Sequence, residues 1–181
     1  MDALPFTAQL INVFAAVLLL LSFAMLAQRR ILSLVDLLAW QGAALVGSTL
    51  AVAYSTGQQH LYYSAALTLA LKVILVPLVL HRLIRRLAVR WDTEPLLNIP
   101  ATMIVGLALV VFSFGLAQPI SALASTVTRS TLGIAIAVVM LSFLMMITRR
   151  KAISQVIGFL SMENGLFFAA TSATYGMPMV V

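Results

Sequence analysis

Two residues of this sequence carry charge inside long apolar runs. Lys72 lies in ALKVILVPLVL, and Glu163 lies in QVIGFLSMENGLFFAA. A charge left in hydrocarbon costs at least about 2.5–3.5 kcal/mol on insertion scales, so residues of this kind normally pair or line a polar cavity. A carboxyl group beside a cation can take up and release a proton, and we therefore predict proton transfer. The alternative is that both charges only fix helix packing.

The two charged residues are expected at the same depth in a membrane. Lys72 comes nine residues before His81, and Glu163 comes eleven residues after Ala152. At 1.5 Å per helical residue they lie roughly 14 and 16 Å below the same surface. A lysine side chain reaches only about 6 Å towards water, so Lys72 must face protein or internal water. Equal depth permits contact, and Lys72 would then modulate the protonation of Glu163.

Three polar or special residues near this pair are possible supports for it. Pro77 has no amide hydrogen, so it releases the carbonyl of Val73 and tends to kink the helix. Asn164 is adjacent to Glu163 in sequence. Gln41 is polar within the second apolar run, where it orders water or packs against another helix.

Asp36 lies near the start of the second apolar run. There a carboxylate complements the helix dipole and can meet Arg29 or Arg30. It is interpreted either as a structural residue or as the cytoplasmic mouth of a proton path.

The elements that must position these residues are membrane helices. The chain has 181 residues, of which 62% are hydrophobic and only 9% charged, unlike a soluble domain. Six continuously apolar runs are long enough to cross a hydrocarbon layer of about 30 Å, and they do not alternate as barrel strands do. The predicted fold is all-α, a polytopic membrane helix bundle forming one integral membrane domain over residues 1–181. The predicted spans are residues 6–27, 34–54, 61–80, 99–117, 131–147 and 152–175.

The basic residues indicate topology rather than nucleic-acid binding. Nine of the eleven Lys and Arg residues stand on three alternate connections, after the first, third and fifth runs. The positive-inside rule places these connections in the cytoplasm and the amino terminus outside. The first run lacks a basic segment before it and a cleavage site after it, so it is predicted to be a retained helix. In residues 81–98 the arginines recur at helical spacing, which predicts a short surface helix that binds phospholipids or an acidic partner.

The sequence offers no catalytic or metal-binding constellation. There is no cysteine, which excludes disulfides, iron-sulfur ligation and thiol chemistry within the chain. His60 and His81 are expected at opposite membrane borders, too far apart to share a metal ion. No nucleophile has a matching base, and no glycine-rich phosphate loop is present.

Two runs of the sequence resemble a known family. TRRKAISQVIGFLSMENGLFFAA and ALKVILVPLVL are similar to the E-type membrane subunit of hydrogenase-4 and formate hydrogenlyase complexes, a resemblance that covers nearly the whole chain. From about Thr131 the chain also resembles the K-type subunit of respiratory complex I and the C subunit of multisubunit cation/proton antiporters. The resemblance divides the chain into four N-terminal helices, residues 1–117, and a K-type-like part, residues 131–181, that lacks the last helix of the K-type unit.

The K-type resemblance is carried by a short series of positions. Arg149 and Arg150 match a basic turn, Ile157 and Gly158 match an Ile-Gly pair, and Asn164 matches an asparagine. The glutamate is displaced, because the K-type position is Leu160 and Glu163 follows three residues later. Three residues are about one helical turn, so both positions lie on a similar face.

The family implies a function in a larger assembly. It implies a non-catalytic membrane-arm subunit of an energy-converting nickel-iron hydrogenase complex, resident in a bacterial cytoplasmic (inner) membrane and contributing to proton translocation. The nickel-iron centre and iron-sulfur clusters would belong to partner chains and none to this one. The expected partners are antiporter-like membrane subunits and the hydrogenase peripheral arm. Two alternatives stay open: a scaffold subunit without a proton path, and a subunit of a cation/proton antiporter without a redox arm.

Overall fold

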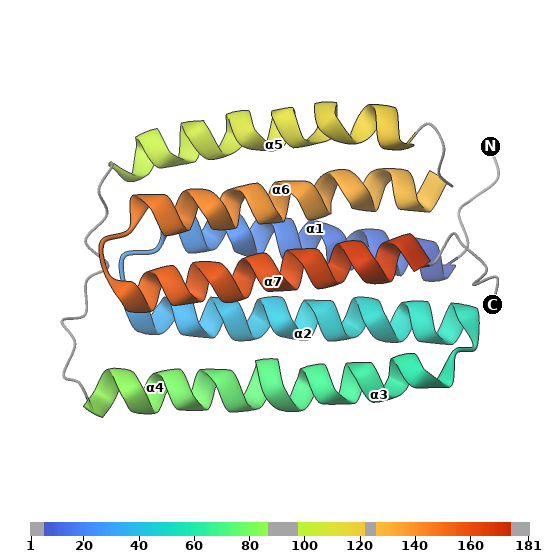
Figure 1. Ribbon diagram of the computed structural model, residues 1–181, viewed down its shortest axis with the longest axis horizontal. Coiled ribbons are helices and arrows are strands. Elements are labelled where there is room, and N and C mark those ends of the chain that lie inside the picture. Colours follow the sequence, from blue (N-terminus) through green and yellow to red (C-terminus); the bar gives the residue numbers. More distant parts are fainter. Residues whose placement is uncertain (1–5, 87–97, 122–125, 175–181) are drawn as a thin grey trace.

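Six long helical rods lie side by side in the computed structural model, which describes residues 6–86, 98–121 and 126–174 (Figure 1). In this part of the chain there is no strand, and six rods are long and apolar enough to cross a membrane. The predicted all-α polytopic membrane bundle is confirmed. The rods are α1 (Phe6–Ala27), α2 (Ile31–Thr56), α3 (Gln59–Thr68) continuing through the π-helix η1 (Leu69–Leu75) into α4 (Val76–Arg86), α5 (Ile99–Ser121), α6 (Thr126–Thr148) and α7 (Ala152–Thr174).

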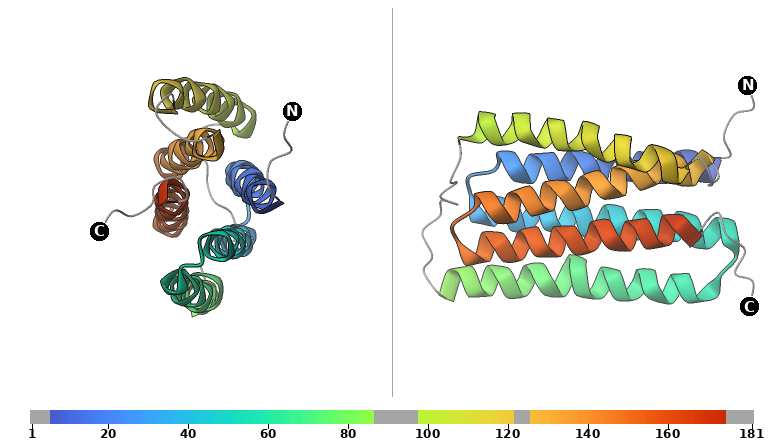
Figure 2. Two further views of the ribbon diagram at one scale, coloured as in Figure 1. Left: turned by 90° about the vertical axis from the view of Figure 1, so that its right-hand side faces the viewer. Right: turned by 45° about the horizontal axis from the view of Figure 1, so that its top comes forward.

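Four rods form the centre of the bundle and two lie at its edges. α1, α2, α6 and α7 pack against one another, while α5 contacts α6 and α1 and the α3–α4 rod contacts α2 (Figure 2). The buried core near the arginine-rich end includes Leu34, Leu141 and Ile157. Residues far apart in sequence on α1, α2, α6 and α7 therefore share one interior.

Glycines let α6 and α7 approach closely. A Cβ atom on Gly158 would lie 2.8 Å from Met146 Cγ, and one on Gly165 would lie 2.9 Å from Val138 Cγ1. Small residues at such positions allow membrane helices to pack backbone to backbone. This packing fixes α7, and with it Glu163, against the rest of the bundle.

The three basic connections gather at one end of the bundle. The α1–α2 connection, the end of α4 and the α6–α7 connection all lie on the left of Figure 1, whereas α6, which carries Arg129 in its first turn, begins at the opposite end. This is the arrangement that the charge pattern predicts. Arg90 lies outside the described residues.

The predicted surface helix is wrong for its first part. Arg82, Arg85 and Arg86 stand on α4, which prolongs the third membrane rod instead of beginning a separate helix. Residues 87–97, the rest of that prediction, lie outside the described part of the chain. The span continues as a helix because no proline or glycine interrupts the chain between Leu80 and Arg86.

Arg149 is buried at the same end, although the sequence counts it among the topology-setting charges. Its side chain is 2% exposed, and Nη2 donates to the carbonyl oxygens of Leu26 at 2.8 Å and Gln28 at 2.9 Å. Burial lowers the pKa of its guanidinium group. A cation at the carbonyl end of α1 satisfies groups that the helix itself leaves unpaired and complements the helix dipole.

We predict that Arg149→Met destabilises the protein by about 2–4 kcal/mol, because hydrogen bonds to charged groups contribute about 1.5–3 kcal/mol each. Unfolding in detergent micelles by increasing SDS measures the change. Arg150→Met is the matched control, since Arg150 is exposed and adjacent. Equal stability of the two variants would contradict the capping role.

The absence of native cysteine allows a direct test of orientation. A membrane-impermeant maleimide, added to sealed right-side-out vesicles, is expected to label Gln59→Cys and to leave Ala152→Cys unlabelled until the membrane is opened. Both positions are exposed and stand at opposite ends of the bundle. The reverse labelling pattern would mean that the basic end faces outward.

Candidate functional site

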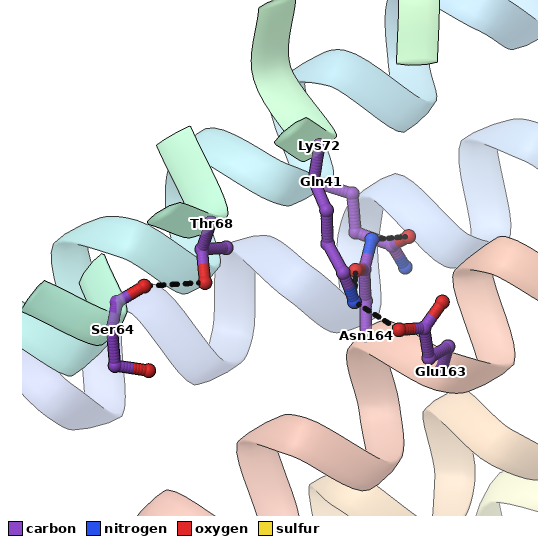
Figure 3. Close-up of polar contacts among 6 residues, drawn as sticks. All are labelled: Gln41, Ser64, Thr68, Lys72, Glu163 and Asn164. Carbon is purple, nitrogen blue, oxygen red and sulfur yellow. Dashed lines mark hydrogen bonds and ion pairs between the residues drawn. The ribbon is translucent and has the colours of Figure 1, made fainter. Parts of the chain in front are cut away.

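Lys72 and Glu163 are in contact. Lys72 Nζ lies 3.0 Å from Glu163 Oε1 and donates a second hydrogen bond to Asn164 Oδ1, also at 3.0 Å (Figure 3). The ammonium group lies 5.7 Å from the centre of the Phe167 ring, within the range of a cation–π contact. Three residues of α7 therefore surround one lysine of η1.

The backbone around Lys72 explains how its side chain reaches α7. Lys72 lies in the π-helical stretch, where the Val76 N–H bonds to the Leu71 carbonyl five residues before it. Pro77 follows and has no N–H to donate. The sequence predicts a kink here, but the structure instead has a π-helix, and the rod continues without a sharp bend (Figure 1). Such π turns often occur at functional sites.

A glycine on α2 brings the π-helix close. A Cβ atom on Gly42 would lie 3.3 Å from Val73 Cγ2 and 3.6 Å from Lys72 Cβ. Because Gly42 has no Cβ atom, α2 and η1 lie close together. Lys72 and Gln41 then both form hydrogen bonds with the Asn164 side chain.

Behind the ion pair, a buried polar network joins the central helices. Asn164 Nδ2 donates to Gln41 Oε1 at 3.1 Å, and Gln41 Nε2 donates to the hydroxyl oxygens of Ser22 and Ser161, each at 2.9 Å. The Ser142 and Ser161 hydroxyl groups share a further hydrogen bond of 2.9 Å. All five residues are buried, and Gln41 is 0% exposed. Both donors of the Gln41 amide and its acceptor are used, so the network holds one arrangement.

Sequence reasoning found Gln41 and Asn164 but missed Ser22 and Ser142. A signal for them exists, because each lies five or six residues from the basic end of its helix. Ser161 lies nine residues after Ala152, about one helical turn deeper by this count. Polar residues within the inner half of several spans indicate a shared polar layer, but the count alone does not pair them.

Asp36 lies apart from this network. Its Oδ1 is 3.5 Å from His81 Nε2, so the basic side chain beside it among the described residues is this histidine and not the expected Arg29 or Arg30. His81 Nδ1 donates to the Pro77 carbonyl oxygen at 2.9 Å, since that oxygen can only accept. His60, in the first turn of α3, stands at the other end of the bundle. Among the described residues, no group of three or more His, Asp or Glu side chains could hold a metal ion.

A small cavity adjoins the ion pair. Its volume is about 10 Å³, and it is lined by Leu38, Lys72, Val76, Leu160 and Asn164. Three of its five lining residues are apolar, and its volume is at the lower limit of what one water molecule needs. Leu160 and Glu163, which are three residues apart on α7, both lie beside Lys72.

Burial decreases along the line from the network to the carboxylate. Gln41 is fully buried, the Lys72 side chain is 19% exposed, and the Glu163 side chain is 50% exposed. The amide groups hold the inner end of the line in place. The carboxylate forms its outer end, at the surface of this chain.

Over 173 residues the chain is 32% identical to an uncharacterized protein, Rv0085, of Mycobacterium tuberculosis (strain ATCC 25618 / H37Rv). The match covers 95% of this chain and 79% of the relative. No protein-family profile and no solved structure matches the chain.

A double-mutant cycle on Gln41→Leu and Asn164→Leu is expected to show coupling of about 0.6–1.7 kcal/mol, the range for hydrogen bonds between membrane helices. Each single change leaves a buried amide without its partner, whereas the double change removes both. Unfolding in SDS-containing micelles measures all four variants. Gln155→Leu serves as an exposed control, and strict additivity would contradict a shared network.

Proposed function

The chain belongs to the family of Rv0085 from Mycobacterium tuberculosis, and from its own residues we propose that it is a membrane-arm subunit of an energy-converting nickel-iron hydrogenase complex. In this role it is a non-catalytic chain of an oxidoreductase complex in a bacterial inner membrane. It contributes to proton translocation coupled to electron transfer. Its partners are antiporter-like membrane subunits and a peripheral arm that holds the nickel-iron centre and the iron-sulfur clusters. The observation that carries the proposal is the 3.0 Å pair of Lys72 and Glu163 at mid-helix.

The pair supports proton transfer because each partner's charge depends on the other's. A proton arriving at Glu163 neutralises the carboxylate and leaves the Lys72 ammonium group without its counterion in a low-dielectric site. Lys72 is then favoured to release its proton onward. Transfer of the Glu163 proton to the neutral Lys72 amine re-forms the ion pair, and Glu163 can accept the next proton. No covalent bond other than those to the moving proton changes.

The buried amide groups of Asn164 and Gln41 position the ion pair and do not carry protons. Asn164 and Gln41 would have to lose an amide proton to pass one along, which is unfavourable for a neutral amide. They fix Lys72 Nζ at 3.0 Å from Glu163 Oε1. The proposed proton path therefore uses the Lys72–Glu163 pair and the open side of Glu163, not the network behind them.

The sequence resemblance supports the same site. In the K-type pattern the membrane glutamate stands at the position of Leu160, which lines the cavity beside Lys72. Glu163 is one helical turn later and contacts the same lysine. Although Glu163 stands three residues after the K-type position, a carboxylate therefore still lies next to Lys72.

A scaffold role is the second candidate, favoured by a specific observation. Gln41 is fully buried and all its hydrogen-bonding groups are used, which is typical of residues that fix packing. On this reading the ion pair only joins η1 to α7. A third candidate, an antiporter subunit without a redox arm, rests on the C-subunit resemblance from Thr131.

Two variants of the assembled complex separate these candidates. Glu163→Gln and Lys72→Met are each expected to lower proton pumping per electron by about tenfold or more, because neither variant can hold the exchangeable charge pair. The measurement is proton uptake by vesicles during turnover, together with mass spectrometry of the chains that purify with the tagged subunit.

Phe112→Leu is the control, since Phe112 is an exposed aromatic residue on α5 and the change leaves both charges in place. Unchanged pumping in fully assembled Glu163→Gln and Lys72→Met complexes would favour the scaffold. The absence of a nickel-iron large subunit among the copurifying chains would favour the antiporter.

A further inference from the structure

One face of α7 lies on the outside of the bundle and is interrupted by a carboxylate. Val156, Phe159, Glu163 and Leu166 recur every three or four residues, and the side chains of the apolar three are about half exposed. We call these four residues the Glu163 face. A face that meets only lipid tails needs no polar group, because lipid tails offer no hydrogen bonds. Glu163 is therefore the feature of this face that requires a partner.

Only one of the two carboxylate oxygens of Glu163 has a partner within the described part of the chain. Oε1 contacts Lys72 Nζ at 3.0 Å, and among the described residues Oε2 has no partner. An ionised carboxylate offers about four acceptor sites. Asn164 directs its amide to Lys72 and Gln41, so it does not supply the missing donor.

The lysine, in contrast, is fully surrounded by this chain. It donates to Glu163 and Asn164, lies over the Phe167 ring and is only 19% exposed. The group that still lacks a hydrogen-bonding partner is therefore the Glu163 carboxylate, which faces outward. A helix that covers this face must bring a donor.

We infer that the Glu163 face docks a transmembrane helix of a different chain, which places a hydrogen-bond donor against Glu163 Oε2 at mid-membrane. Because Lys72 already neutralises the carboxylate, the missing group is a hydrogen-bond donor for Oε2: a basic side chain, a hydroxyl group or an amide. The inference rests on the proposed function only in that the proposed complex supplies such a helix. It names the face and the chemistry of that contact.

A second copy of this chain does not fit the same face. A twofold contact through the Glu163 face would put Glu163 opposite Glu163, two acceptors with like charge and no donor between them. Lipid tails supply no donor either. Compared with a second copy or lipid, a donor-bearing helix of a distinct chain is the occupant that completes the carboxylate, and an adduct within the chain itself would contradict this.

Photocrosslinking in the native membrane tests the contact with the full-length chain in its complex. The photoreactive p-benzoylphenylalanine replaces Phe159, which lies one turn before Glu163, or Phe112, a similarly exposed residue on α5, as control. The expected product at Phe159 is an adduct with a transmembrane helix of another chain, identified by mass spectrometry as carrying a donor at that depth.

Two charge variants make the test specific. Lys72→Met combined with Glu163→Leu removes both charges and leaves no unpaired lysine, and it is expected to lower the Phe159 adduct about tenfold, the effect of losing about 1.4 kcal/mol. Glu163→Gln keeps an acceptor and is expected to retain most of the adduct. The Phe112 adducts should stay unchanged in both variants, which shows that the bundle is folded.

Adducts with lipid alone, with a second copy of the chain, or with a helix that lacks a donor would overturn the inference. An adduct yield at Phe159 that stays the same in the charge variants would also overturn it. The copurifying chains report separately on the proposed function. A donor helix in a complex without a nickel-iron subunit would retain this docking contact and reject the hydrogenase assignment. A hydrogenase complex without the adduct would do the reverse.

Discussion

The requirement that two opposite charges share one site at the centre of the membrane determines the rest of this structure. Either charge alone would be expensive in hydrocarbon, and at 3.0 Å each is the other's counterion. Holding them together demands a helix that can turn Lys72 towards α7 and a neighbour small enough to let it approach. The π-helix and Gly42 meet these two demands.

The inner and outer sides of the pair serve different purposes. On the inner side Asn164 and Gln41 form a closed set of hydrogen bonds that ties α1, α2, α6 and α7 to one register. On the outer side the Glu163 carboxylate is half exposed. A rigid support behind a reachable acid is the arrangement that a proton-handling group needs, because its position must not change when its charge does.

The sequence contains enough to predict the spans, their alternate basic ends and the shared depth of Lys72 and Glu163, because hydropathy and charge placement follow directly from the bilayer. It does not reveal the π-helix, since Pro77 signals only lost hydrogen bonding and not how the backbone responds. Nor does a run of three basic residues indicate that Arg149 alone turns inward. That depends on where the carbonyl end of α1 lies, 121 to 124 positions earlier in the chain.

The place of Glu163 on α7, three residues after Leu160, has a geometric meaning. At Leu160 a carboxylate would line the small cavity beside Lys72, enclosed by Leu38 and Val76. One turn later, at Glu163, it keeps the same lysine but reaches the surface of the chain. Moving the acid by one turn thus exchanges an enclosed carboxylate for one that an adjoining helix can contact. In the proposed complex the subunit boundary would become part of the charge-handling site, and assembly and proton transfer would depend on the same residue.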